Sequence, residues 1–202
     1  MGQNTVRVAV VNNLSDETLI YNTFKDDPNG VVRQVVVAKL SDEQLLFDTF
    51  KYDMEPAVRE VLLYYLSDDQ LIVDAFKNDP EPWIRRYAVE KLSDEQSVLA
   101  FKDDPSGVVR STVVGKLSDE QAILSFKDDP NWAVRVAVVG KLSDEQLIVD
   151  IFKNDDDMDV RKVAMDKLSD KDLIAAFNDG LNEDNEFSDA VSELSANEGL
   201  ML

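Results

Sequence analysis

The sequence predicts an all-α fold, namely a right-handed α-solenoid of about seven short two-helix repeats, and two observations predict it. The first is a repeated phrase, Leu-Ser-Asp, which recurs every 25 or 26 residues at Leu14, Leu40, Leu66, Leu92, Leu117, Leu142 and Leu168. The second is that each interval holds two apolar runs at helical spacing. Helices this short are marginal alone in water, so neighbouring units must stack to form a continuous core.

The first helix of each unit is expected to begin at Ser-Asp-Glu-Gln and to end near a Phe-Lys pair. In the second unit Ser41 is the expected N-cap, and Gln44 completes a capping box. Asp42 and Glu43 then lie in the first turn, where the helix dipole favours anions. The fourth, fifth and seventh units lack one residue inside this helix. We expect a shorter or tighter helix there, for which a 3₁₀ turn is one solution.

The second helix of each unit is expected to begin at Asp-Pro. In the first unit Asp27 is the expected cap and Pro28 the first helical residue, because proline lacks an N–H that would have no partner there. Val32 and Val36 follow at helical spacing, and Lys39 lies near the C-terminus, where a cation is favoured.

This pattern sets the expected domain organisation. A repeat domain covers residues 1–180, beginning with a half repeat over 1–13. The full units are 14–39, 40–65, 66–91, 92–116, 117–141, 142–167 and 168–180. Residues 181–202 form an acidic C-terminal cap or tail, in which Phe187, Val191 and Leu194 would cover the last apolar face.

Composition excludes several classes of chemistry. The 202 residues contain no Cys and no His, which removes disulfides, thiolate nucleophiles, imidazole-based triads and the usual zinc sites. There is no glycine-rich phosphate loop, and the obvious serines are helix caps, so we expect neither catalysis nor a cofactor. No apolar run has the length of a membrane span, and we expect a cytoplasmic protein. The net charge of −20 disfavours direct binding to nucleic acid or membrane and favours a basic protein partner.

Within each unit an Asp, four residues, an apolar residue and an Arg follow one another, and this pattern resembles HEAT repeats. The short period also resembles the leucine-rich-repeat-variant and bacterial HEAT-like families. The matching pairs are Asp27/Arg33, Asp53/Arg59, Asp79/Arg85, Asp104/Arg110, Asp129/Arg135 and Asp155/Arg161. The resemblance implies that these side chains form a hydrogen-bonded ladder between adjacent units, and that the Arg-bearing helix lines a concave side. Met54 and Asp156 depart from it, since the family pattern has Pro there.

Two series of charged residues have alternative interpretations. The arginines could form a ligand-binding row, but we favour the structural ladder, because a site seldom needs seven equal copies. Asp155, Asp157 and Asp159, with Asp166, match the ligand spacing of a calcium loop. Val160 replaces the Gly that such a loop needs, so we expect no metal there.

Positions that vary between units indicate where a partner would bind. The residue after each Arg, and the residues four before and four after it, form one helical stripe. Aromatic and charged residues and one methionine on or beside this stripe are the candidate partner-binding residues: Glu60, Tyr64, Trp83, Arg86, Glu90, Trp132, Met158 and Lys162. Small residues on it, such as Gly107, Gly115 and Gly140, would admit a close approach. Neutral drift of solvent-facing positions explains the variation equally well.

The favoured function is a non-catalytic scaffold or adaptor that binds a basic protein through its concave surface. The alternative is an acidic, nucleic-acid-mimicking inhibitor or immunity-type protein that blocks a basic nucleic-acid-binding enzyme. A host with high internal salt would also account for the acidity. Because the half repeat at 1–13 lacks a partnering first helix, end-to-end association of copies is a further expectation.

Overall fold

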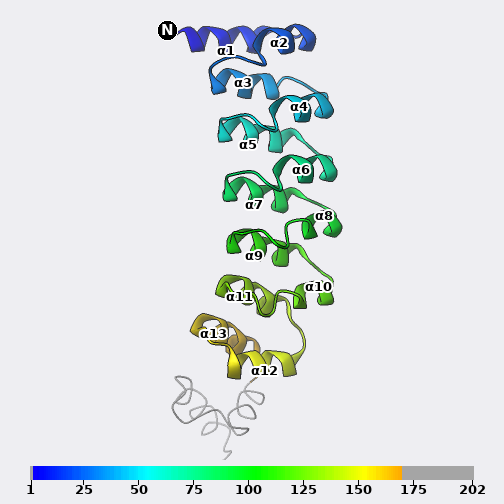
Figure 1. The fold of residues 1–202 in the computed structure, drawn as a ribbon, viewed down its shortest axis with the longest axis vertical. Coiled ribbons are helices and arrows are strands. Elements are labelled where there is room, and N and C mark those ends of the chain that lie inside the picture. Colours follow the sequence, from blue (N-terminus) through cyan, green and yellow to red (C-terminus); the bar gives the residue numbers. More distant parts are fainter. Residues whose placement is uncertain (1, 170–202) are drawn as a thin grey trace, which may run out of the picture. The chain divides into compact units, whose positions relative to one another are not determined.

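The computed structural model describes residues 2–169, and every regular element in this part of the chain is a helix (Figure 1). The predicted all-α class is therefore confirmed. No helix among these residues is long and apolar enough to cross a membrane. The chain divides into two compact units, Met1–Lys116 and Leu117–Leu202, which are described separately.

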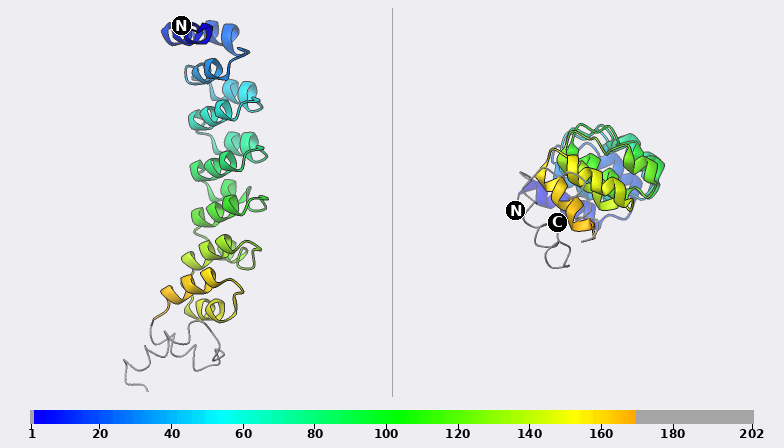
Figure 2. Two further views of the ribbon diagram at one scale, coloured as in Figure 1. Left: turned by 90° about the vertical axis from the view of Figure 1, so that its left-hand side faces the viewer. Right: turned by 90° about the horizontal axis from the view of Figure 1, so that it is seen from below.

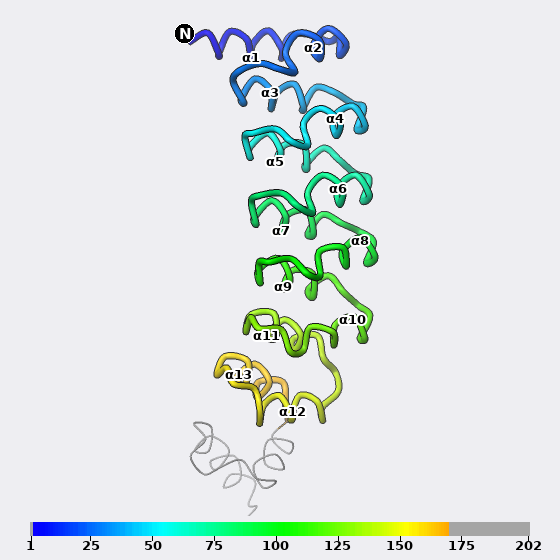
Figure 3. The backbone as a smooth tube through the Cα atoms, viewed as in Figure 1, coloured from blue at the N-terminus to red at the C-terminus, as the bar shows by residue number. Residues whose placement is uncertain are grey.

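The first unit contains nine helices that alternate between two layers. Their bounds are α1 Gln3–Asn13, α2 Glu17–Phe24, α3 Gly30–Val37, α4 Glu43–Phe50, α5 Pro56–Tyr65, α6 Asp69–Phe76, α7 Pro82–Lys91, α8 Glu95–Leu99 and α9 Gly107–Lys116. The odd-numbered helices pack in succession against one another, and α4, α6 and α8 form the second succession (Figures 1 and 3). Each even-numbered helix packs on the odd-numbered helix that follows it, and a side view shows the same order (Figure 2).

The second unit repeats this helix order over four described helices. They are α10 Glu120–Leu124, α11 Trp132–Lys141, α12 Glu145–Asn154 and α13 Met158–Lys167. Contacts join α10 to α11, α11 to α13 and α12 to α13. The segments 168–180 and 181–202 of the predicted organisation, including Phe187, Val191 and Leu194, lie almost wholly outside the described residues.

The core of the first unit is built from residues that recur at the same position of each segment. Phe50 from α4, Phe76 from α6 and Phe101, two residues after α8, are almost completely buried. From the second segment on, the leucine of each Leu-Ser-Asp in this unit is also buried, as Leu66 is, and so is the apolar residue before each Arg from Arg33 on, as Val58 is. Burial of one such side chain is worth about 1.5–3 kcal/mol, so packing between segments stabilises helices that are too short alone.

The predicted serine caps are wrong by one residue. Asp42, rather than Ser41, is the N-cap of α4, and its carboxylate accepts a hydrogen bond from the Leu45 amide at 3.0 Å. Ser41 instead donates through its amide and hydroxyl to the Glu17 carboxylate of the preceding segment, at 3.0 Å each. Gln44 does not close a capping box, because its amide donates to Asp48 at 3.2 Å.

The predicted caps of the second helices are also shifted. Asn29 caps α3, where its side chain accepts from the Val31 amide at 3.1 Å, and the helix begins at Gly30 rather than at Pro28. Asp27 accepts from the Asn29 amide at 2.9 Å and so shapes the turn before the helix. Its carboxylate is thereby also placed to accept hydrogen bonds from Arg7.

The expected shortening of the first helix is confirmed where the fourth and fifth segments are described. Helices α8 and α10 have 5 residues each, whereas α4 and α6 have 8. After α8 the amides of Ala100, Phe101 and Lys102 each donate to the carbonyl three residues earlier, which is the 3₁₀ pattern. This tighter turn lets Phe101 reach the core with one residue fewer.

Candidate binding surface

The recurring arginines bind neighbouring backbone and side-chain groups. Arg33 lies on α3, and its Nε and Nη2 donate to the two carboxylate oxygens of Asp53 at 2.6 and 2.7 Å. Its Nη1 donates to the backbone carbonyl of Asp27 at 2.6 Å. Arg33 therefore binds the turn of its own segment through a carbonyl and the turn of the next segment through a carboxylate.

The same bidentate geometry recurs along both units. The shortest N–O distances are 2.7 Å in Arg7–Asp27, 2.6 Å in Arg59–Asp79, 2.6 Å in Arg85–Asp104 and 2.9 Å in Arg135–Asp155. Arg110 and Arg161 also donate to the carbonyls of Asp104 and Asp155, each at 2.7 Å. Asp129 shapes its turn by accepting from the Asn131 amide at 2.8 Å. Guanidinium groups committed in this way have little capacity left for a ligand.

Hydrogen bonds and burial shift the pKa values of several of these side chains. The hydrogen bond to the paired Asp raises the pKa of Arg33, Arg59 and Arg85 above its ordinary value, against an opposing effect of burial. Burial favours the neutral form of Asp27, but its hydrogen bonds to Arg7 and to the Asn29 amide outweigh this and lower its pKa below 3.8. Asp155 has a lowered pKa for the same reasons, with Arg135 as its partner. Both carboxyls are thus held ionised.

A second recurring contact joins the C-terminal ends of the odd-numbered helices. A lysine near the end of one helix donates to carbonyls at the end of the helix before it. Lys39 Nζ binds the Asn12 carbonyl at 2.8 Å, and Lys116 binds that of Glu90 at 3.0 Å. Lys91 donates to the carbonyls of Leu63, at 2.8 Å, and Tyr64. Burial lowers the pKa of Lys91, with Glu43 acting against the shift.

Lysines of the second unit make the same contact. Lys141 Nζ lies 3.1 Å from the Leu117 carbonyl. Lys167 reaches three carbonyls, those of Val139 and Gly140 at 3.0 Å and that of Leu142 at 2.6 Å. We call Lys39, Lys91, Lys116, Lys141 and Lys167 the C-terminal lysines. They place a cation at the negative end of a helix dipole in each case.

Four exposed aromatic side chains gather on α5 and α7, and we call them the aromatic surface: Tyr64, Tyr65, Trp83 and Tyr87. Tyr64 is 75% exposed, and the other three are 37–40% exposed. Tyr64 and Tyr65 meet edge to face with ring centroids 5.1 Å apart, and Trp83 and Tyr87 do so at 5.9 Å. Such contacts hold the rings in position without covering them.

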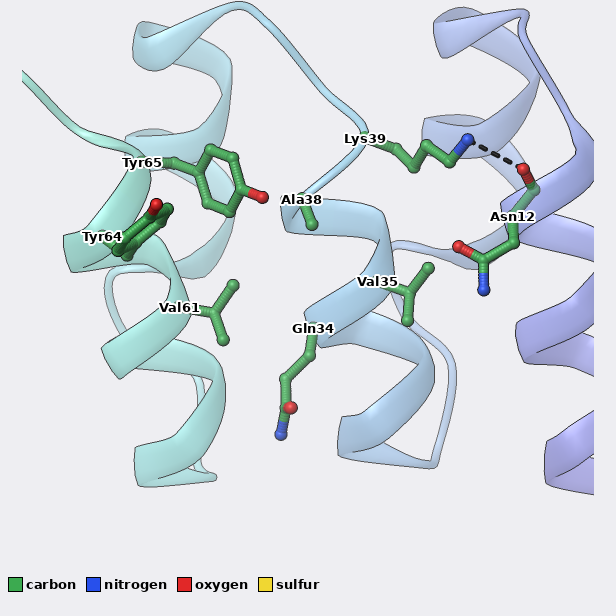
Figure 4. A pocket seen from close by; sticks show the side chains of 8 residues that line it. All are labelled: Asn12, Gln34, Val35, Ala38, Lys39, Val61, Tyr64 and Tyr65. Atoms are coloured by element: carbon green, nitrogen blue, oxygen red, sulfur yellow. Dashed lines mark hydrogen bonds between the residues drawn. The ribbon is translucent and has the colours of Figure 1, made fainter.

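Two hollows flank Tyr64 within this unit. One, of about 410 Å³, opens between the ends of α1, α3 and α5 and is lined by Asn12, Gln34, Val35, Ala38, Lys39, Val61, Tyr64 and Tyr65 (Figure 4). The other, also about 410 Å³, lies between α5 and α7 and is lined by Glu60, Val61, Leu63, Tyr64, Tyr87 and Lys91. The aromatic surface therefore has concave relief on both sides of its most exposed ring.

The structure brings five of the eight candidate partner-binding residues onto two adjacent helices. Glu60 and Tyr64 lie on α5, and Trp83, Arg86 and Glu90 lie on α7. The Arg86 guanidinium lies 4.8 Å from the Tyr87 ring centre and 3.5 Å from the Glu90 carboxylate. Trp132, Met158 and Lys162, all exposed, lie on α11 and α13 of the second unit.

Sequence reasoning missed Tyr65 and Tyr87. A signal for Tyr65 existed, because the residue before Leu-Ser is Lys in five of the seven segments and Tyr only here. The small residues of the stripe differ in how much free space surrounds them. Space around Gly115 and Gly140 is open, whereas the Glu55 carboxylate covers Gly30.

The residues with calcium-loop spacing serve other purposes. Arg135 binds both Asp155, at 2.9 Å, and Asp156, at 2.7 Å. Asp157 is the N-cap of α13 and accepts from the Asp159 amide at 2.9 Å. Among the described residues no group of three or more acidic side chains has an arrangement that would hold a metal ion.

Comparison with known proteins gives no family to which the chain can be assigned. No family model matches it, and no curated protein or solved structure shows significant similarity to it.

Proposed function

We propose that the chain is a non-catalytic scaffold that binds a basic protein through the aromatic surface. In this proposal the two units belong to one right-handed, HEAT-like α-solenoid of about seven repeats, and the odd-numbered helices form its concave side. The observation that carries the proposal is that four exposed aromatic side chains, Tyr64, Tyr65, Trp83 and Tyr87, gather on the adjacent helices α5 and α7.

The physical reason for this function is the chemistry of the exposed rings. Tyrosine and tryptophan bury large areas with few rotatable bonds, and they dominate the energetics of protein interfaces. Their hydroxyl and indole groups also keep the uncovered surface compatible with water. The net charge of −20 would attract a basic partner and speed its association.

The test is affinity capture from the native host, with two matched variants of the full chain. The first, Tyr64→Ser/Trp83→Ser/Tyr87→Ser, removes the rings of the aromatic surface. The control, Tyr52→Ser/Met54→Ser, removes two apolar side chains that are more exposed, at 82% and 86%. A basic protein captured by wild type and control but lost with the first variant supports the proposal. Equal capture by all three would refute it.

The net charge of −20 also supports a second candidate, an acidic inhibitor that occupies the nucleic-acid site of a basic enzyme. Salt separates the two candidates. Between 0.05 and 0.5 M salt the Debye length falls from about 14 Å to about 4 Å. Inhibitor binding that depends on surface charge should therefore weaken steeply over this range. Binding through aromatic rings that become buried in the interface should change little. Affinity measured at the two salt concentrations decides between them.

A further inference from the structure

The series of C-terminal lysines is interrupted at one position in the first unit. Lys39 and Lys91 each reach back 27 residues to a carbonyl at the end of the preceding odd-numbered helix. The corresponding residue of the segment between them is Tyr65. By the same spacing, a lysine there would reach the carbonyls of Val37 and Ala38, at the end of α3.

No cationic side chain of the described residues takes over this role. Within residues 2–169 no lysine or arginine donates to the carbonyl of Val37 or Ala38, although such a donor binds the corresponding end of α1 and α5. The last carbonyls of a helix have no partner within it, and they carry the negative end of its dipole. The end of α3 is thus a preformed acceptor for a cation.

The hollow of about 410 Å³ lies at this place (Figure 4). Val35 and Val61 provide apolar walls that suit the methylene stem of a lysine, and Tyr65 points its ring across the hollow toward Ala38. Of the lining residues, Lys39 is cationic, but its ammonium is directed away to the Asn12 carbonyl. Tyr64 and Tyr65 supply ring faces that attract an ammonium group.

We infer that this hollow binds a lysine side chain of the partner protein, with its ammonium at the carbonyl end of α3. The partner would supply the cation that each other described pair of successive odd-numbered helices within one unit receives from its own chain at this place or close to it. The inference rests on the proposed function and names the chemical group that the scaffold recognises.

The test is an NMR titration of the ¹⁵N-labelled full chain with Nα-acetyl-lysine methylamide, and with the norleucine analogue, which has the same stem without the charge. We expect saturable shifts of the Val37, Ala38 and Tyr65 amides. Half-saturation should come at a concentration about tenfold lower for the lysine probe. Equal response to both probes, or shifts without saturation, would overturn the inference.

Two variants make the test specific. Tyr65→Lys supplies the missing lysine from within the chain, so it should abolish the saturable response while the chain stays folded by circular dichroism. Tyr65→Phe keeps the hollow open and should retain the response. A response that survives in Tyr65→Lys would contradict the assignment of the site.

Partner capture distinguishes failure of this inference from failure of the proposed function. Because Tyr65 also belongs to the aromatic surface, Tyr65→Ser is the control that removes the ring without supplying a cation, and loss of the captured protein on Tyr65→Lys but not on Tyr65→Ser supports the inference. If capture requires Tyr64, Trp83 and Tyr87 but is unchanged by Tyr65→Lys, the scaffold function stands and the lysine site is wrong.

Discussion

Removing one arginine of the buried pairs should destabilise the first unit far more than removing an exposed one. In the Arg59–Asp79 pair the side chains are only 7% and 1% exposed. Arg59→Met deletes two hydrogen bonds to the carboxylate, at 2.6 and 3.0 Å, and one to the Asp53 carbonyl, at 2.7 Å. The Glu81 amide, at 2.9 Å, stays as a donor to a carboxylate that is still buried.

Breaking a buried pair in this way costs about 3–5 kcal/mol, because one charge is left without its partner. The exposed pair Arg86–Glu90, at 3.5 Å with side chains 36% and 47% exposed, is the matched control. Arg86→Met should cost about 0–1 kcal/mol. With a urea slope of about 2 kcal/mol per M, Arg59→Met should lower the unfolding midpoint by about 2 M.

The two tryptophans make the assay specific for one unit, since Trp83 lies in the first and Trp132 in the second. Urea unfolding is therefore followed by fluorescence in a Trp132→Phe background, where Trp83 on α7 reports on the helix that packs against α5. Arg59→Met/Asp79→Asn should recover part of the loss, because it also removes the unpaired charge. Midpoints of Arg59→Met and Arg86→Met that agree within about 0.5 M would refute the reasoning.

Three further predictions concern caps, acid and core. Asp42→Ala should cost about 1 kcal/mol and more than Ser41→Ala, because the aspartate caps α4; urea midpoints rank the two variants. Asp27 and Asp155 have pKa values below 3.8 in the folded state, so their contribution is complete above about pH 5 and is lost as the pH falls through those lowered values. Thermal melts at pH 7, 5 and 3 should show this loss, and equal stability at pH 7 and 3 would contradict it. Phe76→Ala should cost about 3–5 kcal/mol in the same urea assay, because the ring is fully buried, and a cost below about 1 kcal/mol would mean that the core relaxes around it.

Local patterns predicted the helices well, because apolar periodicity and Pro, Gly and Asp turns act over a few residues. The caps were misplaced because serine and aspartate are both good N-caps and stand side by side. The choice between the two caps depends on a residue distant in sequence. Glu17 binds the Ser41 amide and hydroxyl, and Asp42 therefore caps α4. The residue spacing within one segment cannot predict that contact, because it joins two segments.

The candidate site was predictable in part. Comparison of the segments identified Tyr64 and Trp83, because they lie on or beside the positions that vary along the predicted stripe. Tyr65 lies outside that stripe and was missed. Tyr65 stands where other segments have a lysine, and the role of that lysine is visible only in the structure. Lys91, for example, donates to carbonyls at the end of the preceding odd-numbered helix. Neither the hollow beside Tyr65 nor the edge-to-face ring pairs can be derived from composition or period.

The pairing of each arginine with the aspartate of the following segment bears on how such a chain can change its length. Arg33 meets Asp53, and Arg59 meets Asp79, each 20 residues further on. Deleting residues 40–65 would remove one paired arginine, Arg59, together with one paired aspartate, Asp53, and would set Arg33 at the same spacing from Asp79. Whole segments can thus be lost or duplicated without stranding a buried charge, whereas a cut within a segment cannot.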